Sequence, residues 1–191
     1  NFELIEDIAN ECFIPFAYGG GIKDLYTINR IFKLGAEKVI LNSVSFFNLP
    51  LITDASNKFG SQSIVVSIDV KKNRWGKKEV VVMSGTKRTG IDPIKYAVDM
   101  QNAGAGELYV HSVDRDGTRK GYDIELFSEI SKNVDIPVIA SGGAGKLEDM
   151  KFVVDKTGVN AVAAGSLFVY YGDMNGVLIN YPKREEIETL F

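Results

Sequence analysis

Three acidic side chains follow apolar, β-rich segments at positions where a carboxylate can transfer protons. Asp69 closes one such segment, and Asp114 and Asp116 come directly after another. An aspartate at the end of a strand can serve as a general acid or base. We expect Asp69 to be catalytic. Asp116 fits catalysis and a turn cap equally well, and Asp114 is better explained as a cap that pairs with Arg115 or a local amide.

Two glycine-rich turns have the composition of phosphate-binding loops. Segments 18–22 (YGGGI) and 140–144 (ASGGA) each follow an apolar segment and precede a helical pattern. Without a Cβ, the backbone N–H groups can approach a phosphate, and the next helix adds partial positive charge. The alternative is that the glycines only turn the chain. If both turns bind phosphate, the ligand groups are Gly20, Gly21, Asn42 and Ser43 at one end, and Ser141, Gly142, Gly143, Gly165 and Ser166 at the other.

The two turns belong to an internal repeat. In each copy a proline begins a strand, which is followed by two glycines, a helix and a second strand that ends beside a serine. Gly20 and Gly142 are 122 positions apart, and Ser43 and Ser166 are 123 positions apart. A barrel built from two similar halves explains this repeat, because all its strand ends converge on one face.

Hydrophobic patterning predicts alternating strands and helices, which is typical of parallel α/β folds. The predicted strands are 14–18, 38–42, 64–70, 107–112, 136–140 and 161–165, and the predicted helices are 2–11, 24–34, 48–59, 92–103, 124–133, 147–156 and 183–190. Residues 72–83 resemble a β-hairpin inserted after a barrel strand. We therefore expect residues 1–191 to form a single α/β domain, a (β/α)₈ barrel. One or two βα units, about 60 residues, are expected before residue 1.

Several further residues have two readings. His111, the only histidine, is more readily explained as a structural or ligand-lining residue than as a catalyst. The polar loop 84–90 could cover an anionic ligand or be solvated. Lys38 and Glu107 begin two strands at the opposite rim, where a stabilising ion pair is the simplest explanation. Charged side chains that point inward at the start of a barrel strand are nevertheless unusual, so a functional role for Lys38 and Glu107 is the alternative.

The composition excludes other classes of function. A net charge of -3 gives no electrostatic reason to expect nucleic acid or an acidic membrane as a partner, and no apolar segment has transmembrane length. Cys12, the single cysteine, excludes an internal disulfide and indicates a reducing compartment, the cytoplasm. No cluster of residues has metal-ligand spacing, so neither a metal nor a cofactor is expected.

The sequence resembles the cyclase subunit of imidazole glycerol phosphate synthase. The similarity runs through the whole chain, and is most specific in segments 114–118 (DRDGT) and 139–145 (IASGGAG). The resemblance implies a (β/α)₈ barrel that takes ammonia from a separate glutaminase subunit and adds it to a ribulosyl-type bisphosphate. The products are imidazole glycerol phosphate and an aminoimidazole carboxamide ribonucleotide, in histidine biosynthesis.

The resemblance also implies residue roles. Asp69 is one of two catalytic aspartates, and Lys38 and Glu107 belong to a charged gate for ammonia. The resemblance implies that phosphates are held by Gly21, Asn42, Ser43, Gly117, Gly143 and Ser166. Combined with the residues singled out above, the expected substrate- or phosphate-binding set is Gly20, Gly21, Asn42, Ser43, His111, Asp116, Gly117, Ser141, Gly142, Gly143, Gly165 and Ser166.

Two features depart from this family. His111 replaces a small hydroxyl residue, and segment 165–182 is similar to a paralogous branch associated with surface-polysaccharide sugars. In that branch the barrel conducts ammonia to a separate sugar amidotransferase. The paralogue is therefore an alternative function, and a phosphosugar-binding barrel without catalytic activity is another.

Overall fold

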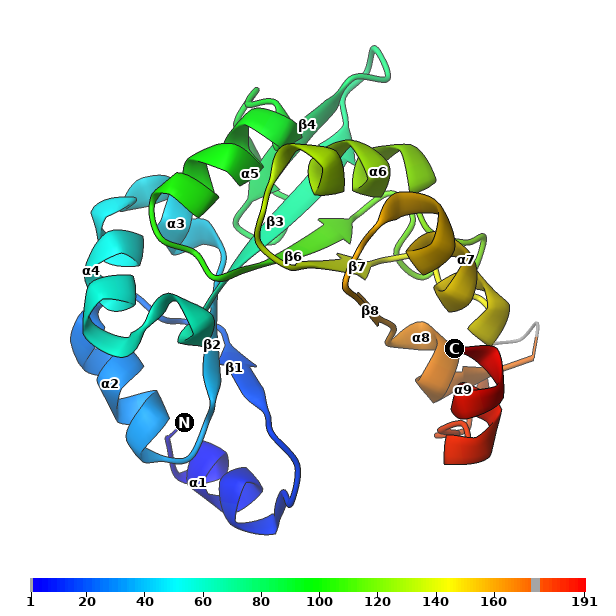
Figure 1. The fold of residues 1–191 in the computed structure, drawn as a ribbon, viewed down its shortest axis with the longest axis horizontal. Helices are drawn as coiled ribbons and strands as arrows, with labels where there is room; N and C mark the ends of the chain where they lie inside the picture. Colours follow the sequence, from blue (N-terminus) through cyan, green and yellow to red (C-terminus); the bar gives the residue numbers. More distant parts are fainter. Residues whose placement is uncertain (1, 173–175) are drawn as a thin grey trace.

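The computed structural model describes residues 2–172 and 176–191, and its centre is a curled sheet of parallel strands. The order across the sheet is β1-β2-β3-β6-β7-β8, and each strand is parallel to its neighbour on this path. The bounds are Ala17–Gly19 for β1, Lys38–Leu41 for β2, Ile64–Lys72 for β3, Glu107–Ser112 for β6, Val138–Ser141 for β7 and Ala161–Ala163 for β8. Figure 1 shows these strands along an arc, with β1 and β8 at its two ends.

Helices lie on the convex side of the arc and leave the concave side uncovered (Figure 1). They are α1 (Phe2–Glu11), α2 (Leu25–Lys33), α4 (Pro50–Phe59), α5 (Pro93–Asn102), α6 (Ile124–Asn133), α7 (Leu147–Thr157) and α9 (Arg184–Leu190), with the short helices α3 (Ser43–Phe47) and α8 (Ser166–Val169) and a 3₁₀ turn at Ser61–Ser63. Strand, helix and parallel strand alternate as in a (β/α)₈ barrel, which confirms the predicted fold class.

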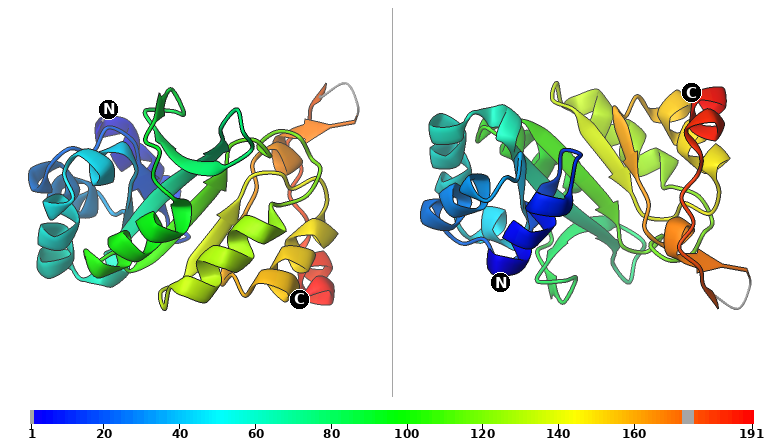
Figure 2. Two further views of the ribbon diagram at one scale, coloured as in Figure 1. Left: turned by 90° about the horizontal axis from the view of Figure 1, so that it is seen from above. Right: turned by 90° about the horizontal axis from the view of Figure 1, so that it is seen from below.

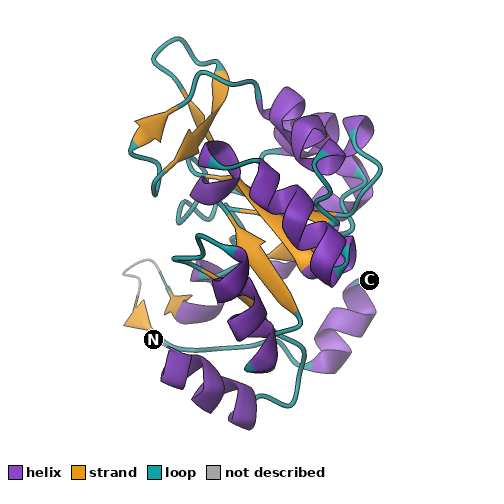
Figure 3. Ribbon diagram, turned by 90° about the vertical axis from the view of Figure 1, so that its left-hand side faces the viewer, coloured by secondary structure: helices purple, strands orange, loops and turns teal. Residues whose placement is uncertain are grey.

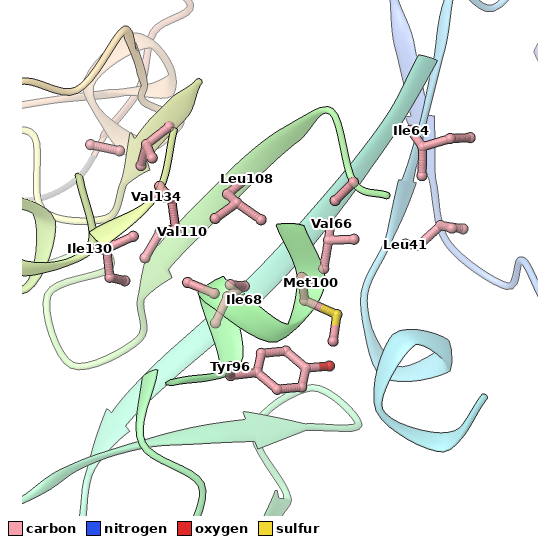
Figure 4. Close-up of a cluster of buried hydrophobic side chains, with 14 of the residues drawn as sticks. Leu41, Ile64, Val66, Ile68, Tyr96, Met100, Leu108, Val110, Ile130 and Val134 are labelled. Carbon is pink, nitrogen blue, oxygen red and sulfur yellow. The ribbon is translucent and has the colours of Figure 1, made fainter. Parts of the chain in front are cut away.

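Side chains alternate along the strands between a fully buried apolar face of the sheet, called the dry layer below, and a partly exposed face that carries polar groups. In β6, Leu108 and Val110 are fully buried, whereas Glu107, Tyr109 and His111 are only partly buried. Successive side chains of a strand point to opposite faces, so the first set packs under the helices and the second faces the concave side. Figure 4 shows the dry layer, where side chains of the strands meet Tyr96 and Met100 of α5.

The predicted hairpin is present and lengthens β3 beyond the other strands. After Asp69, β3 continues to Lys72 and pairs antiparallel with β4 (Lys78–Val82), which pairs with β5 (Lys87–Arg88). In Figures 2 and 3 this hairpin projects beyond the layer of helices. Lys78 anchors it, because its Nζ lies 2.9 Å from Asp123 Oδ1 and 2.8 Å from Glu125 Oε2 at the start of α6.

Several boundaries differ from the prediction. The first strand begins at Ala17 rather than residue 14, and Pro15 has no N–H to contribute to a ladder. The predicted helix 48–59 is α4 alone, and α3 precedes it as a separate element. Two further elements were not predicted from the sequence, the short helix α8 and a small antiparallel pair, β9 (Tyr170–Tyr171) with β10 (Gly176–Val177). α3 and α8 follow corresponding strands, so the repeat extends one element further than predicted.

Within the described ranges, no helix combines the length and the apolar character needed to cross a membrane. Over the same residues, no three or more histidine, cysteine, aspartate and glutamate side chains are grouped so that they could hold a metal ion.

Candidate functional site

The carboxyl edge of the sheet brings three predicted residues into one row. Asp69 of β3 is in register with His111 of β6, and His111 is in register with Ser141 of β7. The carboxyl ends of parallel barrel strands are where enzymes of this architecture carry their chemistry. The row lies between two pockets, one over β1, β2 and β3 and the other over β6, β7 and β8.

The first pocket has a volume of about 630 Å³ and contains the predicted residues of the first phosphate loop. The predicted residues that line it are Gly20, Gly21, Asn42, Ser43 and Asp69. Gly20 and Gly21 have φ angles of +125° and +68°, which favour glycine, and a Cβ built on either meets no atom within 4 Å. Their backbone therefore borders open space, as a loop that admits a ligand must.

Asp69 has an electrostatic environment suited to proton transfer. Burial raises its pKa above the ordinary aspartate value, a hydrogen bond from the Asn42 side chain lowers it, and the charge of His111 also lowers it. The net shift is upward, so desolvation outweighs the two stabilising interactions. A carboxyl group with a raised pKa stays protonated to a higher pH, which helps it act as an acid and then as a base.

Asn42 and Ser43 connect the pocket to β3 and to the hairpin. The Asn42 Nδ2 donates to Ser67 Oγ at 3.1 Å, and the Ser43 Oγ accepts from the Met83 N–H at 2.9 Å. The Ser43 O–H itself donates to Asn42 Oδ1 at 3.4 Å, a long hydrogen bond that a ligand oxygen can replace. Met83 and Ser84 have φ angles of +54° and +55°, unusual for residues with side chains, and both line the first pocket.

The second pocket contains most of the remaining predicted residues but is much smaller, about 20 Å³. The predicted residues that line it are Asp116, Gly117, Ser141, Gly142, Gly143, Gly165 and Ser166. A Cβ on Gly142 would lie 2.6 Å from Ser112 O, and one on Gly143 would lie 2.3 Å from Gly121 O. These two glycines are thus required by close packing of backbones, whereas Gly20 and Gly21 border open space.

His111 does not line either pocket, but it is linked to the second one. Its Nδ1 lies 3.2 Å from Ser141 Oγ, and its Nε2 lies 3.8 Å from Asp116 Oδ2. Ser141 Oγ also accepts a hydrogen bond of 2.7 Å from the hydroxyl of Tyr109. His111 is therefore a bridging residue between Asp69 and the second pocket.

Lys38 and Glu107 form the ion pair that the sequence suggested, with Nζ 2.7 Å from Oε2. They lie at the amino ends of β2 and β6, and β3 separates these strands. The pair therefore spans the concave side at the rim opposite Asp69. Asp114 is structural, as expected, but its partner is distant in sequence, because its Oδ2 accepts the Lys72 N–H at 2.7 Å.

Three residues around the site were not predicted from the sequence. Lys23 and Met83 line the first pocket, and Tyr109 contacts Ser141. Lys23 directly follows the glycine turn and was the easiest to find, because a cation there suits a phosphate. Of the polar loop 84–90, which had two readings, Ser84 reaches the first pocket.

A curled parallel sheet, with helices on its convex side and both pockets at its carboxyl edge, defines a protein of the (β/α)₈-barrel class. The family model described as histidine biosynthesis protein matches residues 1–175, and the chain belongs to this family.

Individual relatives agree with this assignment. The chain is 46% identical over 189 residues to the "Putative imidazole glycerol phosphate synthase subunit hisF2" of Pseudomonas aeruginosa, which covers 99% of this chain and 75% of the relative. It is 40% identical over 173 residues to the "Imidazole glycerol phosphate synthase subunit HisF" of Streptococcus mutans, covering 91% and 68%. Its identity to the protein of the same name from Alkaliphilus metalliredigens is 42% over 168 residues, covering 88% and 67%.

Proposed function

We propose that this chain is the cyclase subunit of an imidazole glycerol phosphate synthase. It uses ammonia to convert a ribulosyl bisphosphate-type nucleotide into imidazole glycerol phosphate and an aminoimidazole carboxamide ribonucleotide. The observation that carries the proposal is the position of Asp69, a partly buried carboxyl with a raised pKa at the carboxyl edge, between two pockets lined by glycine turns. Residues 1–191 act as one domain in this proposal, without a cofactor.

Each pocket binds one phosphate of the substrate. In the first, Gly20 and Gly21 offer backbone N–H groups, and Lys23 supplies a positive charge. Ser43 offers its O–H in exchange for the 3.4 Å hydrogen bond that it donates to Asn42 Oδ1. In the second, Gly143 and Ser166 take the corresponding roles. The second pocket has room for only about one water molecule, so the exposed loop at Asp116 and Gly117 has to move outward to admit a phosphate.

Asp69 carries the proton transfers of ring closure and cleavage. Its carboxyl faces the first pocket and is in register with His111 at the approach to the second. A substrate that fills both pockets passes over this row, which brings its reacting centre to Asp69. Ammonia is supplied by a glutaminase partner in the cytoplasm and enters past the Lys38–Glu107 pair.

A second candidate is the paralogue that passes ammonia to a sugar amidotransferase. Two features favour it over the histidine pathway, namely His111 in place of a small hydroxyl residue and the ending 165–182, where the apolar side chains of Val177, Ile179 and Tyr181 are exposed.

The decisive experiment supplies the ribulosyl bisphosphate-type nucleotide together with ammonium and measures imidazole glycerol phosphate. The cyclase proposal expects turnover by the natural protein and a loss of at least about 100-fold in Asp69→Asn, with substrate binding retained. Absence of turnover in a protein that binds the nucleotide would favour the paralogue. Equal turnover by Asp69→Asn would remove Asp69 from the mechanism.

A further inference from the structure

The side chain of Tyr109 lies on the concave face of β6, two residues before His111, and no role in the proposed function uses it. Its hydroxyl donates to Ser141 Oγ at 2.7 Å, and Ser141 Oγ lies 3.2 Å from His111 Nδ1. Ser141 is 6% exposed, so its own hydroxyl proton needs a partner within the protein. In the described part of the chain, the acceptor within reach of that proton is His111 Nδ1.

The other ring nitrogen of His111 gives an independent argument for the same arrangement. Nε2 lies 3.8 Å from Asp116 Oδ2, too far for a hydrogen bond but close enough for an electrostatic interaction, which solvent weakens because the Asp116 side chain is 60% exposed. If Nδ1 carried the proton, a lone pair on Nε2 would face a carboxylate. If Nε2 carries it, the N–H dipole points toward the negative charge, which is the favourable orientation.

We propose that Tyr109 and Ser141 form a hydroxyl relay that holds neutral His111 as its Nε2–H tautomer, with this N–H as a donor to a phosphate oxygen in the second pocket. The relay runs from Tyr109 O–H to Ser141 Oγ, and from Ser141 O–H to His111 Nδ1. Tyr109 and Ser141 are then positioning residues, and His111 is the ligand contact. The tautomer of His111 does not depend on the proposed function. The phosphate contact does, because it rests on the proposal that the second pocket binds a phosphate.

The relay also explains why a carboxylate is tolerated beside an anion pocket. Asp116 lines the second pocket and, when ionised, repels a phosphate. The Nε2–H dipole attracts the Asp116 carboxylate in the present structure and attracts a phosphate once the loop at Asp116 has moved outward to admit it. When the ligand binds, the N–H has no hydrogen-bonded acceptor to release, because Asp116 Oδ2 is at 3.8 Å.

Nitrogen-15 NMR of the imidazole tests the relay directly, at a pH where free imidazole is neutral. Variant His111→Asn identifies the signals of His111 in the full-length protein. We expect the natural protein to show a protonated Nε2 and an unprotonated Nδ1, and Tyr109→Phe to show a mixture of both tautomers. Tyr96→Phe is the matched control, because Tyr96 OH also pairs with a buried serine, Ser45, at 2.8 Å, and Tyr96 lies on α5.

Two results would overturn the relay: an Nδ1–H tautomer in the natural protein, or the same tautomer population in Tyr109→Phe as in Tyr96→Phe. Folding is checked by the backbone amide spectrum of each variant. Since Ser141→Ala removes the middle of the relay, it is expected to give the same mixture as Tyr109→Phe.

Titration with inorganic phosphate tests the ligand contact. We expect phosphate to shift both the His111 Nε2–H and the Gly143 amide signals, and to bind roughly three- to tenfold more weakly to Tyr109→Phe than to Tyr96→Phe. A shift at Gly143 without one at His111 would refute the contact while the second anion site stands. No shift at either signal would refute the anion site of the proposed function and, with it, the contact, and would leave the tautomer result intact.

Discussion

Asp69 and His111 occupy facing positions on the neighbouring parallel strands β3 and β6. The pairing places the only histidine of the sequence beside the partly buried carboxyl group of the first pocket. Burial raises the pKa of Asp69 more than Asn42 and His111 lower it. Ionisation of Asp69 is therefore less favourable in the folded protein than in the unfolded chain, which is the cost of keeping a carboxyl group ready for proton transfer.

Asp69→Asn is expected to stabilise the fold at neutral pH. Because the pKa of Asp69 is higher in the folded than in the unfolded chain, folding is disfavoured wherever the carboxyl ionises. The gain from asparagine is thus fully present above the folded pKa and disappears as the pH falls below the ordinary carboxyl value. Urea unfolding at neutral and acidic pH measures it, with the exposed Asp54→Asn on α4 as control. An equal gain at both pH values would contradict the electrostatic explanation.

Asn42→Ala is expected to move the pH profile of the reaction. The Asn42 side chain hydrogen-bonds the Asp69 carboxyl and lowers its pKa, so its removal raises that pKa further. The limb of the kcat/KM profile that reports Asp69 should therefore shift to higher pH, measured with ammonium as the nitrogen source. Asn133→Ala, at the exposed end of α6, is the control. A lower rate with an unshifted limb would mean that Asn42 binds substrate without tuning Asp69.

Much of the fold can be predicted from the sequence, because the strands are short apolar runs between amphipathic helices. The elements that escaped prediction depend on distant contacts or are very short. α3 and α8 have five and four residues, too few for a helical period to be visible. The additional residues of β3 gain their ladder from β4, a pairing that follows from the hairpin and not from the local pattern.

Site residues could be predicted where the signal lies in a short stretch of neighbouring residues. Glycine pairs and the acidic end of a strand are visible in the sequence itself, and the structure places them in two pockets at one edge. Met83 and Ser84 reach the first pocket only because β4 runs back along β3. Tyr109 looks like an ordinary strand residue, and its link to Ser141 becomes visible only once β6 and β7 are in register.

The two glycine turns should respond differently to alanine. Gly21→Ala places a Cβ in open space and costs only the strain of a positive φ, about 1 kcal/mol of folding free energy. Gly143→Ala brings a Cβ to 2.3 Å from Gly121 O, so the 112–121 loop has to shift, and a loss of roughly 2–4 kcal/mol is expected.

Urea unfolding measures both losses, and calorimetry with the bisphosphate measures binding. Gly21→Ala should weaken binding while leaving most of the stability, since its Cβ projects into the ligand space of the first pocket. Gly76→Ala is a suitable control, because Gly76 also has a positive φ and open space but lies in the hairpin. If Gly21→Ala and Gly76→Ala bound the bisphosphate equally well, the first glycine turn would not be a phosphate loop.

Substitutions of Lys38 and Glu107 test whether ammonia enters at the amino ends of the strands, the rim opposite Asp69. Their 2.7 Å ion pair crosses the concave side opposite Asp69, so a substitution there should leave the chemistry with free ammonium largely intact. Lys38→Ala and Glu107→Ala are expected to lower the ratio of glutamine-driven to ammonium-driven turnover by roughly fivefold or more in the complex with the glutaminase. Lys151→Ala breaks a surface pair on α7 and should leave the ratio unchanged.

The double variant Lys38→Glu with Glu107→Lys exchanges the two charges and so distinguishes the effect of the ion pair from the effects of the individual side chains. If the contact itself governs entry, the double variant should recover part of the ratio that each alanine variant loses, as a coupling between the two positions. If ammonium-driven and glutamine-driven turnover fall together in all variants, the pair is structural. The amino rim would then contribute to the stability of the barrel and not to the supply of ammonia.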